Sequence, residues 1–168
     1  MGPVKFESAS DLFNNSLTAL IWVAASKDVL PKNCIRHAVH TRDGSSTYVA
    51  RAFYQGGLHP GKGIDTQCWI SYDGKEIWKE NNFELLTGHS AAVKWVHVRG
   101  AFDPVLLGDS VPVQAGYEAN GEHLYVAQAH FGKGVSWQCG KVKLGSPAMI
   151  PCFGKEHLFQ EYLVMVYG

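Results

Sequence analysis

The chain contains one pattern twice, and this repetition constrains its fold more than any other feature. The pair Trp22–Val23 returns as Trp95–Val96, and the segment YVARA at 48–52 returns as YVAQA at 125–129. Three further matches follow in the same order: Gly61–Lys62 with Gly140–Lys141, GKE at 74–76 with GKE at 154–156, and FELL at 83–86 with YLVM at 162–165. The offsets between the partners are 73, 77, 79, 80 and 79, so a few short loop insertions explain the drift. We expect two repeats, at 21–88 and 94–168, that either pack about a pseudo-twofold axis or exchange strands, behind a short N-terminal segment at 1–20.

Both repeats have the chemistry of β-strands. Segments rich in β-branched and aromatic residues are separated by Gly, Asp, Asn and Pro, which favour turns. These segments are 48–53, 68–72, 93–98, 123–130 and 162–167. The sequence therefore predicts an all-β fold.

Turn signals and one amphipathic segment complete the secondary-structure prediction. Asp43–Gly44, Asp73–Gly74 and Asn120–Gly121 are pairs that tolerate the positive φ of primed hairpin turns. At the N-terminus, Ser10 could cap a helix over 11–20, although the same residues could form an added strand.

Composition excludes several classes of partner. The 168 residues carry 15 Lys plus Arg against 15 Asp plus Glu, so no net charge is available to hold a phosphate backbone, and we expect no nucleic acid partner. The longest apolar run, 19–25, is too short to insert across a membrane. The four cysteines form no C-x-x-C pair and no secretory leader opens the chain, so we expect free thiols in the cytoplasm.

Metal and catalytic sites are weakly supported. His37 and His40 are the closest histidine pair, but their spacing directs the two rings to opposite faces of a strand or loop, and nothing nearby completes a ligand set. Cys139 with a nearby histidine remains open as a nucleophile, although catalysis also needs an orienting group that the sequence does not show. We therefore expect no metal, no cofactor and no enzymatic activity.

The repeated pattern is similar to the DM9 repeat. The resemblance rests on AGYE at 115–118 followed by Asn120–Gly121, on the two YVA segments and on HPGK at 59–62, and it covers residue 21 to the C-terminus. Two-repeat members of that family include calcium-independent, mannose-binding lectins of invertebrate innate immunity, and related proteins that relocate on infection or stress. The resemblance thus implies a mannose-binding lectin that is cytoplasmic, vesicle-associated or released by a non-classical route.

The resemblance also implies where a sugar would bind. In the family an acidic residue before the YVA strand and the lysine of the PGK turn are linked with sugar recognition. Here these are Glu118 and Lys141 in the second repeat and Lys62 in the first. Thr41 aligns with Glu118, so either Asp43, two residues on, substitutes after a small register change or one of the two sites is weakened. His40 and Tyr117 would flank these pairs.

The proposed residues have the chemistry that a sugar requires, because a carboxylate accepts from neighbouring hydroxyls and an ammonium donates to them. Spacing alone favours a plainer interpretation, in which these are exposed turn charges worth about 0 to 1 kcal/mol each. If the sugar site is correct, replacing Glu118 or Lys141 should weaken sugar binding while the melting temperature barely moves.

Tryptophan positions suggest two roles. Trp22 and Trp95 are equivalent, which indicates packing in the core or between the repeats, whereas Trp137 falls before Lys141 and could line a groove between the repeats. A homodimer built through residues 1–20 would raise avidity for mannose-containing glycans. The alternative function is a cytosolic or vesicle-associated protein-interaction scaffold.

Overall fold

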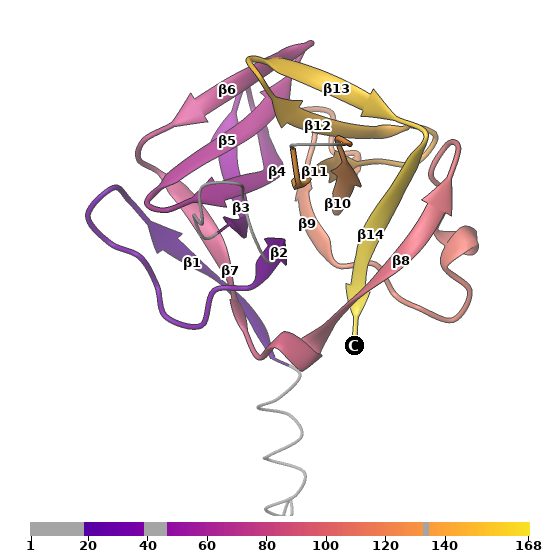
Figure 1. Ribbon diagram of the computed structural model, residues 1–168, viewed down its shortest axis with the longest axis horizontal. Coiled ribbons are helices and arrows are strands. Elements are labelled where there is room, and N and C mark those ends of the chain that lie inside the picture. The colour runs from indigo at the N-terminus through magenta and orange to yellow at the C-terminus, as the bar shows by residue number, and fades with distance from the viewer. Residues whose placement is uncertain (1–18, 39–46, 133–134) are drawn as a thin grey trace, which may run out of the picture.

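The computed structural model describes residues 19–38, 47–132 and 135–168, and these contain only strands, two short 3-10 turns and loops (Figure 1). The all-β prediction is confirmed. The strands are β1 (Leu20–Ala25), β2 (Arg36–Ala38), β3 (Thr47–Tyr54), β4 (Gly57–Ile64), β5 (Gln67–Tyr72), β6 (Lys75–Lys79), β7 (Phe83–Gly88), β8 (Val93–Arg99), β9 (Gln114–Tyr117), β10 (His123–His130), β11 (Trp137–Val142), β12 (Ala148–Cys152), β13 (Lys155–Phe159) and β14 (Glu161–Tyr167). The 3-10 turns are η1 (Ser90–Ala92) and η2 (Pro104–Leu107).

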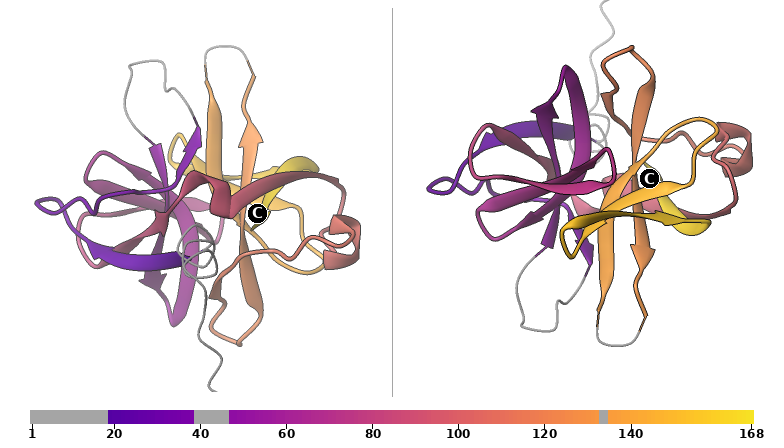
Figure 2. Two further views of the ribbon diagram at one scale, coloured as in Figure 1. Left: turned by 90° about the horizontal axis from the view of Figure 1, so that it is seen from below. Right: turned by 90° about the horizontal axis from the view of Figure 1, so that it is seen from above.

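The strand order is symmetric about its centre. The main path runs β1-β7-β3-β4-β5-β6 and then β13-β12-β11-β10-β14-β8, while β2 pairs with β3 and β9 pairs with β10 and β4. Each strand of the first six has its counterpart at the mirrored place in the last six, as the sequence matches require. Figure 2 shows the two halves side by side, the first in indigo and magenta and the second in orange and yellow.

The halves meet at the centre of this order. Lys75 in β6 is the register partner of Lys155 in β13, and these two lysines are equivalent positions. Around this pair, Glu76 N donates to Gly154 O at 3.2 Å and Glu156 N donates to Gly74 O at 3.0 Å. Each bond is the counterpart of the other, so the pseudo-twofold axis passes between β6 and β13.

Strands rich in aromatic and β-branched residues lie where the sequence places them, and β10 has the predicted bounds 123–130. The strand β4 was not predicted, because its sequence GLHPGKGI carries Pro and Gly, which usually mark loops. Its Gly61 is required by close packing, since a Cβ there would lie 2.1 Å from Trp69 O. The equivalent Gly140 in β11 has the same constraint, with Met149 O at 2.3 Å from its Cβ position.

The turn predictions have mixed outcomes. Asp73 and Gly74 both have positive φ, 48° and 79°, and join β5 to β6 as predicted. Asn120–Gly121 also lies in a tight turn, as predicted, with Gly121 N donating to Glu118 O at 2.9 Å, but only Gly121 has positive φ, so the primed conformation is not formed. Asp43–Gly44 and the segment preceding residue 19, with most of the expected helix, lie outside the described residues, and β1 begins at Leu20.

Three apolar clusters form the core, one in each half and one between them. The shared cluster joins Ile35, Val49 and Leu86 of the first half to Val113, Ala115, Val126, Cys139 and Met165 of the second. Trp22 and Trp95, both partly buried, pack against it. The prediction that these two residues pack in the core or between the repeats is therefore confirmed.

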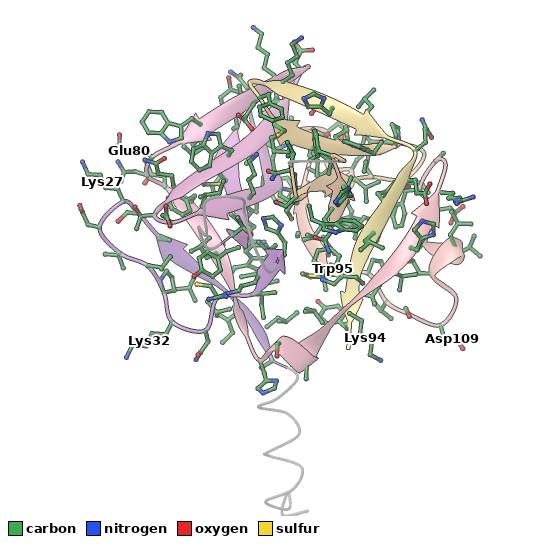
Figure 3. All side chains as sticks on the ribbon, viewed as in Figure 1. Lys27, Lys32, Glu80, Lys94, Trp95 and Asp109 are labelled. Atoms are coloured by element: carbon green, nitrogen blue, oxygen red, sulfur yellow. The ribbon has the colours of Figure 1, made fainter. Side chains whose placement is uncertain are left out.

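The cysteines are free thiols, as expected, and Cys68, Cys139 and Cys152 are buried. None of the described residues forms a helix long and apolar enough to cross a membrane. Exposed ion pairs such as Lys27–Glu80, at 3.6 Å, lie on the outer rim of the molecule (Figure 3).

Candidate functional site

Lys62 projects from β4 into the boundary between the halves. Its ammonium donates to Gln138 Oε1 at 2.7 Å and to the carbonyl oxygen of Pro151 at 2.8 Å, both in the second half. It also forms an ion pair with Glu76 Oε2 at 3.2 Å. Lys62 is 5% exposed, so its buried ammonium is held by two hydrogen bonds and one ion pair.

Lys141 projects from β11 in the opposite direction. Its ammonium donates to the carbonyl oxygen of Ser71 at 2.8 Å and to His59 Nδ1 at 2.9 Å, both in the first half. The ammonium also lies 5.7 Å from the ring centroid of Tyr72. Lys141 is 2% exposed.

The two lysines are counterparts, and so are their partners. Gln138 is equivalent to His59 and Pro151 is equivalent to Ser71, at the same offsets that relate the rest of the halves. Each half therefore supplies an ammonium that is bound by the other half. Charged hydrogen bonds across a low-dielectric boundary of this kind lock the relative position of the halves.

The protonation state of His59 follows from its surroundings. Burial, reinforced by the charge of Lys141, lowers the pKa of His59 to about 4. The neutral ring then donates from Nε2 to Tyr54 O at 3.1 Å and accepts from Lys141 at Nδ1. Burial also lowers the pKa of Lys141, while Glu118 and Glu156 favour its charged form.

Glu118 and Tyr117 lie at the surface above Lys141, where β9 ends. The side chain of Glu118 is 19% exposed and its carboxylate forms an ion pair with Lys143 at 3.7 Å. Lys143 also pairs with Glu122 at 3.2 Å. Tyr117 is 39% exposed. The carboxylate of Glu118, the ammonium of Lys143 and the exposed residue Tyr117, which precedes Glu118 in the chain, form a small polar surface region that we call the Glu118 site.

The structure brings together some of the predicted site residues. Glu118, Tyr117 and Lys141 belong to one region, whereas Lys62 lies in the equivalent region of the first half. Asp43 and His40, its expected neighbours, lie outside the described residues.

Two expectations about the lysines are wrong. Lys62 and Lys141 were predicted to lie in turns, but both lie in strands. The glycine before each lysine does not mark a turn, because it is required by the close approach of a neighbouring backbone oxygen. The expectation that replacing Lys141 barely changes the melting temperature also fails, because its removal would leave buried acceptors without a donor.

The thiols lack the properties of a nucleophile. Burial raises the pKa of Cys139 and of Cys68 far above the ordinary thiol value, and burial raises the pKa of Cys152 as well. A raised pKa removes the thiolate that nucleophilic attack requires. Within 19–38, 47–132 and 135–168, no group of three or more His, Cys, Asp or Glu residues could hold a metal ion.

Trp137 lies away from the boundary between the halves. It lines a cleft of about 450 Å³ together with His97, His130, Leu158 and Glu161. His130 contacts the indole edge-on, with ring centroids 5.4 Å apart. The expectation that Trp137 lines the groove between the halves is wrong, because all the residues that line this cleft belong to the second half.

Sequence reasoning missed the partners of the two lysines. The only available signal was the repeat itself, since GKE at 74–76 and at 154–156 preserves Glu76 and Glu156 at equivalent positions. His59 was noted as part of the HPGK motif, and nothing in the sequence indicated that its ring faces Lys141.

The fold and this boundary define an all-β protein with two similar halves, each of which binds a buried lysine of the other half. A model of the DM9 repeat matches residues 41–159, so the chain belongs to the DM9 repeat family. Among solved structures, it is similar to the nematode sperm cell motility protein MFP2B, with a TM-score of 0.65 and 12% sequence identity. The match covers 89% of this chain and 44% of that one, so the chain spans less than half the length of MFP2B, and the likeness concerns the fold alone. No curated protein sequence matches the chain.

Proposed function

We propose that the protein is a carbohydrate-binding protein that recognises mannose-type glycans without a metal ion. The observation that carries the proposal is the Glu118 site, where a partly exposed carboxylate lies beside Lys143 and the preceding residue, Tyr117, is exposed. A carboxylate can accept from two adjacent hydroxyls, an ammonium can donate to a third, and an aromatic ring can pack against the apolar face of a hexose. Family membership supports the same assignment.

Lys141 has an indirect role in this proposal. Its ammonium is buried and bound by Ser71 and His59, so it lies behind the site and not on its surface. Glu118 in turn favours the charged form of Lys141, so the two groups are electrostatically coupled. Lys62 has the equivalent place in the first half.

We also propose that the two halves are tandem DM9 repeats, bounded by 21–88 and 94–168, and that each provides one sugar site. One hexose in a small polar site binds with about 4 kcal/mol, near millimolar Kd, so recognition of a microbial surface needs several sites. A homodimer would double their number. Defence or stress recognition, from the cytoplasm, from vesicles or after non-classical release, is the setting we infer from the family.

A glycan array with competing free mannose tests the function. Binding to mannose-rich glycans that free mannose inhibits is the expected result. An array with no bound glycan, repeated with mannan-coated beads to provide avidity, would overturn the proposal. Light scattering at tens of micromolar protein tests the dimer separately, and a strict monomer would reject it.

A protein-interaction scaffold is the second candidate. Apolar side chains of the segment between β8 and β9 are unusually exposed, with Val105 at 75%, Val111 at 59% and Leu106 at 49%. Exposed apolar groups close together often mark a binding surface for another protein. Replacement of Val105 and Leu106 by Ser should leave mannose binding unchanged if the lectin assignment is correct.

A further inference from the structure

The two equivalent tryptophans differ in what covers them. In the first half, the guanidinium carbon of Arg51 lies 4.2 Å from the ring centroid of Trp22. The same guanidinium pairs with Glu84 at 2.7 Å and donates to the carbonyl oxygen of Ala115 in β9 at 3.0 Å. The side chain of Arg51 thus fills the space between Trp22 and the opposite half.

The second half lacks the arginine that makes this contact. By the repeat offsets, Gln128 replaces Arg51 and Leu163 replaces Glu84. Trp95 is paired with Met165, and Gln128 is paired with Leu163, so the strand register places Gln128 on the same sheet face as Trp95. Gln128 is 4% exposed and its Oε1 has no hydrogen-bond partner. The shorter, neutral side chain cannot repeat the cation contact that Arg51 makes.

Trp95 instead lines a cavity of about 870 Å³, which we call the Trp95 pocket. The pocket lies at the end of the molecule where β1 and β7 approach β8, and in Figure 3 Trp95 lies at the centre, between the two halves. Its apolar wall includes Trp95, Val93 and Ile35. A volume of this size is in the range of small-molecule sites.

The polar lining of the pocket is positive. Lys32 and Arg36, both exposed, belong to it, together with Asn33, His89 and Ser90. Among the described lining residues there is no carboxylate. Charge complementarity therefore favours an anion, while the amide and hydroxyl groups of Asn33 and Ser90 can bind the hydroxyls of the ligand.

We propose that the Trp95 pocket binds an acidic hexose, that is, a hexose carrying a phosphate or carboxylate group. The C–H face of the pyranose packs on the indole of Trp95, in the space that Arg51 fills on Trp22, and the acidic group pairs with Lys32 and Arg36. This site shares no residue with the Glu118 site and takes a charged ligand in place of a neutral one. It goes beyond the proposed function and stands or fails independently of it.

Titration calorimetry of the full chain with mannose 6-phosphate, mannose and inorganic phosphate tests the proposal. We expect mannose 6-phosphate to bind at least tenfold more tightly than either of the others, because only it offers both a ring and an anion. The same affinity for inorganic phosphate and mannose 6-phosphate would overturn the ring contact. The same affinity for mannose and mannose 6-phosphate would overturn the ionic contact.

Matched variants locate the site. Arg36→Ala and Trp95→Phe should each weaken mannose 6-phosphate binding at least fivefold. Lys94→Ala and Trp22→Phe are the controls, since Lys94 adjoins Trp95 but points from the other face of β8 and Trp22 is covered by Arg51. Unchanged binding in Arg36→Ala, which alters an exposed side chain and keeps the fold, would reject the site. Glu118→Gln should leave this binding intact even if it abolishes mannose binding.

The internal symmetry also supplies a blocking variant. Gln128→Arg with Leu163→Glu copies the Arg51–Glu84 pair onto the second half and should abolish binding of mannose 6-phosphate. If this double variant does not fold, the Arg36→Ala and Trp95→Phe results decide. Ala19 lines the pocket, so the segment 1–18 is the competing occupant, and a chain starting at residue 19 belongs in the same titration. Binding that appears only after this deletion would assign the pocket to the segment and overturn the proposal.

Discussion

The ammonium of Lys62 donates to the carbonyl oxygen of Pro151, 89 positions further along the chain, at 2.8 Å. Its counterpart Lys141 donates to Ser71 O at the same distance. Both contacts are buried, and each joins a lysine of one half to a carbonyl oxygen of the other half. The stability of either half therefore depends on the other.

Replacement of Lys62 by Met should lower the free energy of unfolding by about 3 to 5 kcal/mol, because Glu76 and Gln138 would lose their buried partner. Urea unfolding monitored by tryptophan fluorescence measures this loss. Lys27→Met, which removes an exposed ion pair with Glu80 on the outer rim of the same half, is the control and should change stability by less than about 1 kcal/mol. Equal effects of the two variants would show that the boundary contacts do not hold the halves together.

Glu118→Gln should weaken mannose binding by about 1 to 3 kcal/mol, since the amide is neutral and accepts at only one atom. Calorimetry or competition on a mannan surface measures the change. Glu122→Gln provides the control, because Glu122 also pairs with Lys143 but is more exposed, at 49%. Normal binding in Glu118→Gln would place the sugar site elsewhere.

Stability should fall as the pH decreases from about 6.5 toward 4. Burial lowers the pKa of His59 to about 4 and that of His37 to about 3, with Lys141 and Lys62 adding to the respective effects. Between the pKa of the folded state and the ordinary histidine pKa of about 6.5, the unfolded chain binds protons that the folded chain excludes. Each histidine therefore lowers the free energy of unfolding by about 1.4 kcal/mol for each unit by which the pH falls in this range.

A His37→Leu variant isolates one of these two contributions. His37 is buried and neither ring nitrogen has a hydrogen-bond partner, so an apolar replacement should preserve or raise stability at pH 7. The difference between its stability at pH 7 and at pH 4.5 should be smaller than that of the original chain. A variant of the exposed His123 should show the original pH dependence. An unchanged slope in His37→Leu would contradict the assignment.

Phe153→Asp should raise the free energy of unfolding by about 0.5 to 1 kcal/mol. Phe153 has φ of 52° in the turn between β12 and β13, and it is 71% exposed, so its ring gains little from packing. The equivalent position in the first half is Asp73, a residue type that tolerates this conformation better. The reciprocal variant Asp73→Phe should lose a similar amount, and thermal unfolding of both variants measures the pair.

Mannose binding should persist in excess EDTA, because the proposed contacts use carboxylate, ammonium and aromatic groups alone. Calorimetry with and without chelator makes the comparison. Binding that disappears in EDTA and returns with calcium would refute the proposed mode of recognition.

Much of the fold could be predicted from the sequence because repetition and strand composition are local signals. The strands β3, β5, β8, β10 and β14 carry aromatic and β-branched residues and were found within one residue of their ends. The strand β4 was missed because Pro and Gly usually mark loops. Gly61 is required there by the close approach of Trp69 O on a neighbouring strand, a contact that the local sequence does not reveal.

The candidate site was less predictable because its geometry is non-local. Lys62 and Lys141 were identified as important from the repeat, but their burial depends on Pro151 and Ser71, which lie in the other half. A charged side chain beside glycine in a single sequence is most often exposed. Only the arrangement of the halves shows that these charges are enclosed and paired.

The meeting of Lys75 and Lys155 at the pseudo-twofold axis has one further consequence. The contact is self-complementary, since exchanging the two halves leaves it unchanged. Two separate copies of one half could make the same contact between identical surfaces. The covalent connection through η1 keeps the local concentration of each half near the other at about the millimolar level or higher, so the chain does not depend on protein concentration to assemble. Because the two halves are covalently joined, they can acquire different side chains at equivalent positions and still remain assembled.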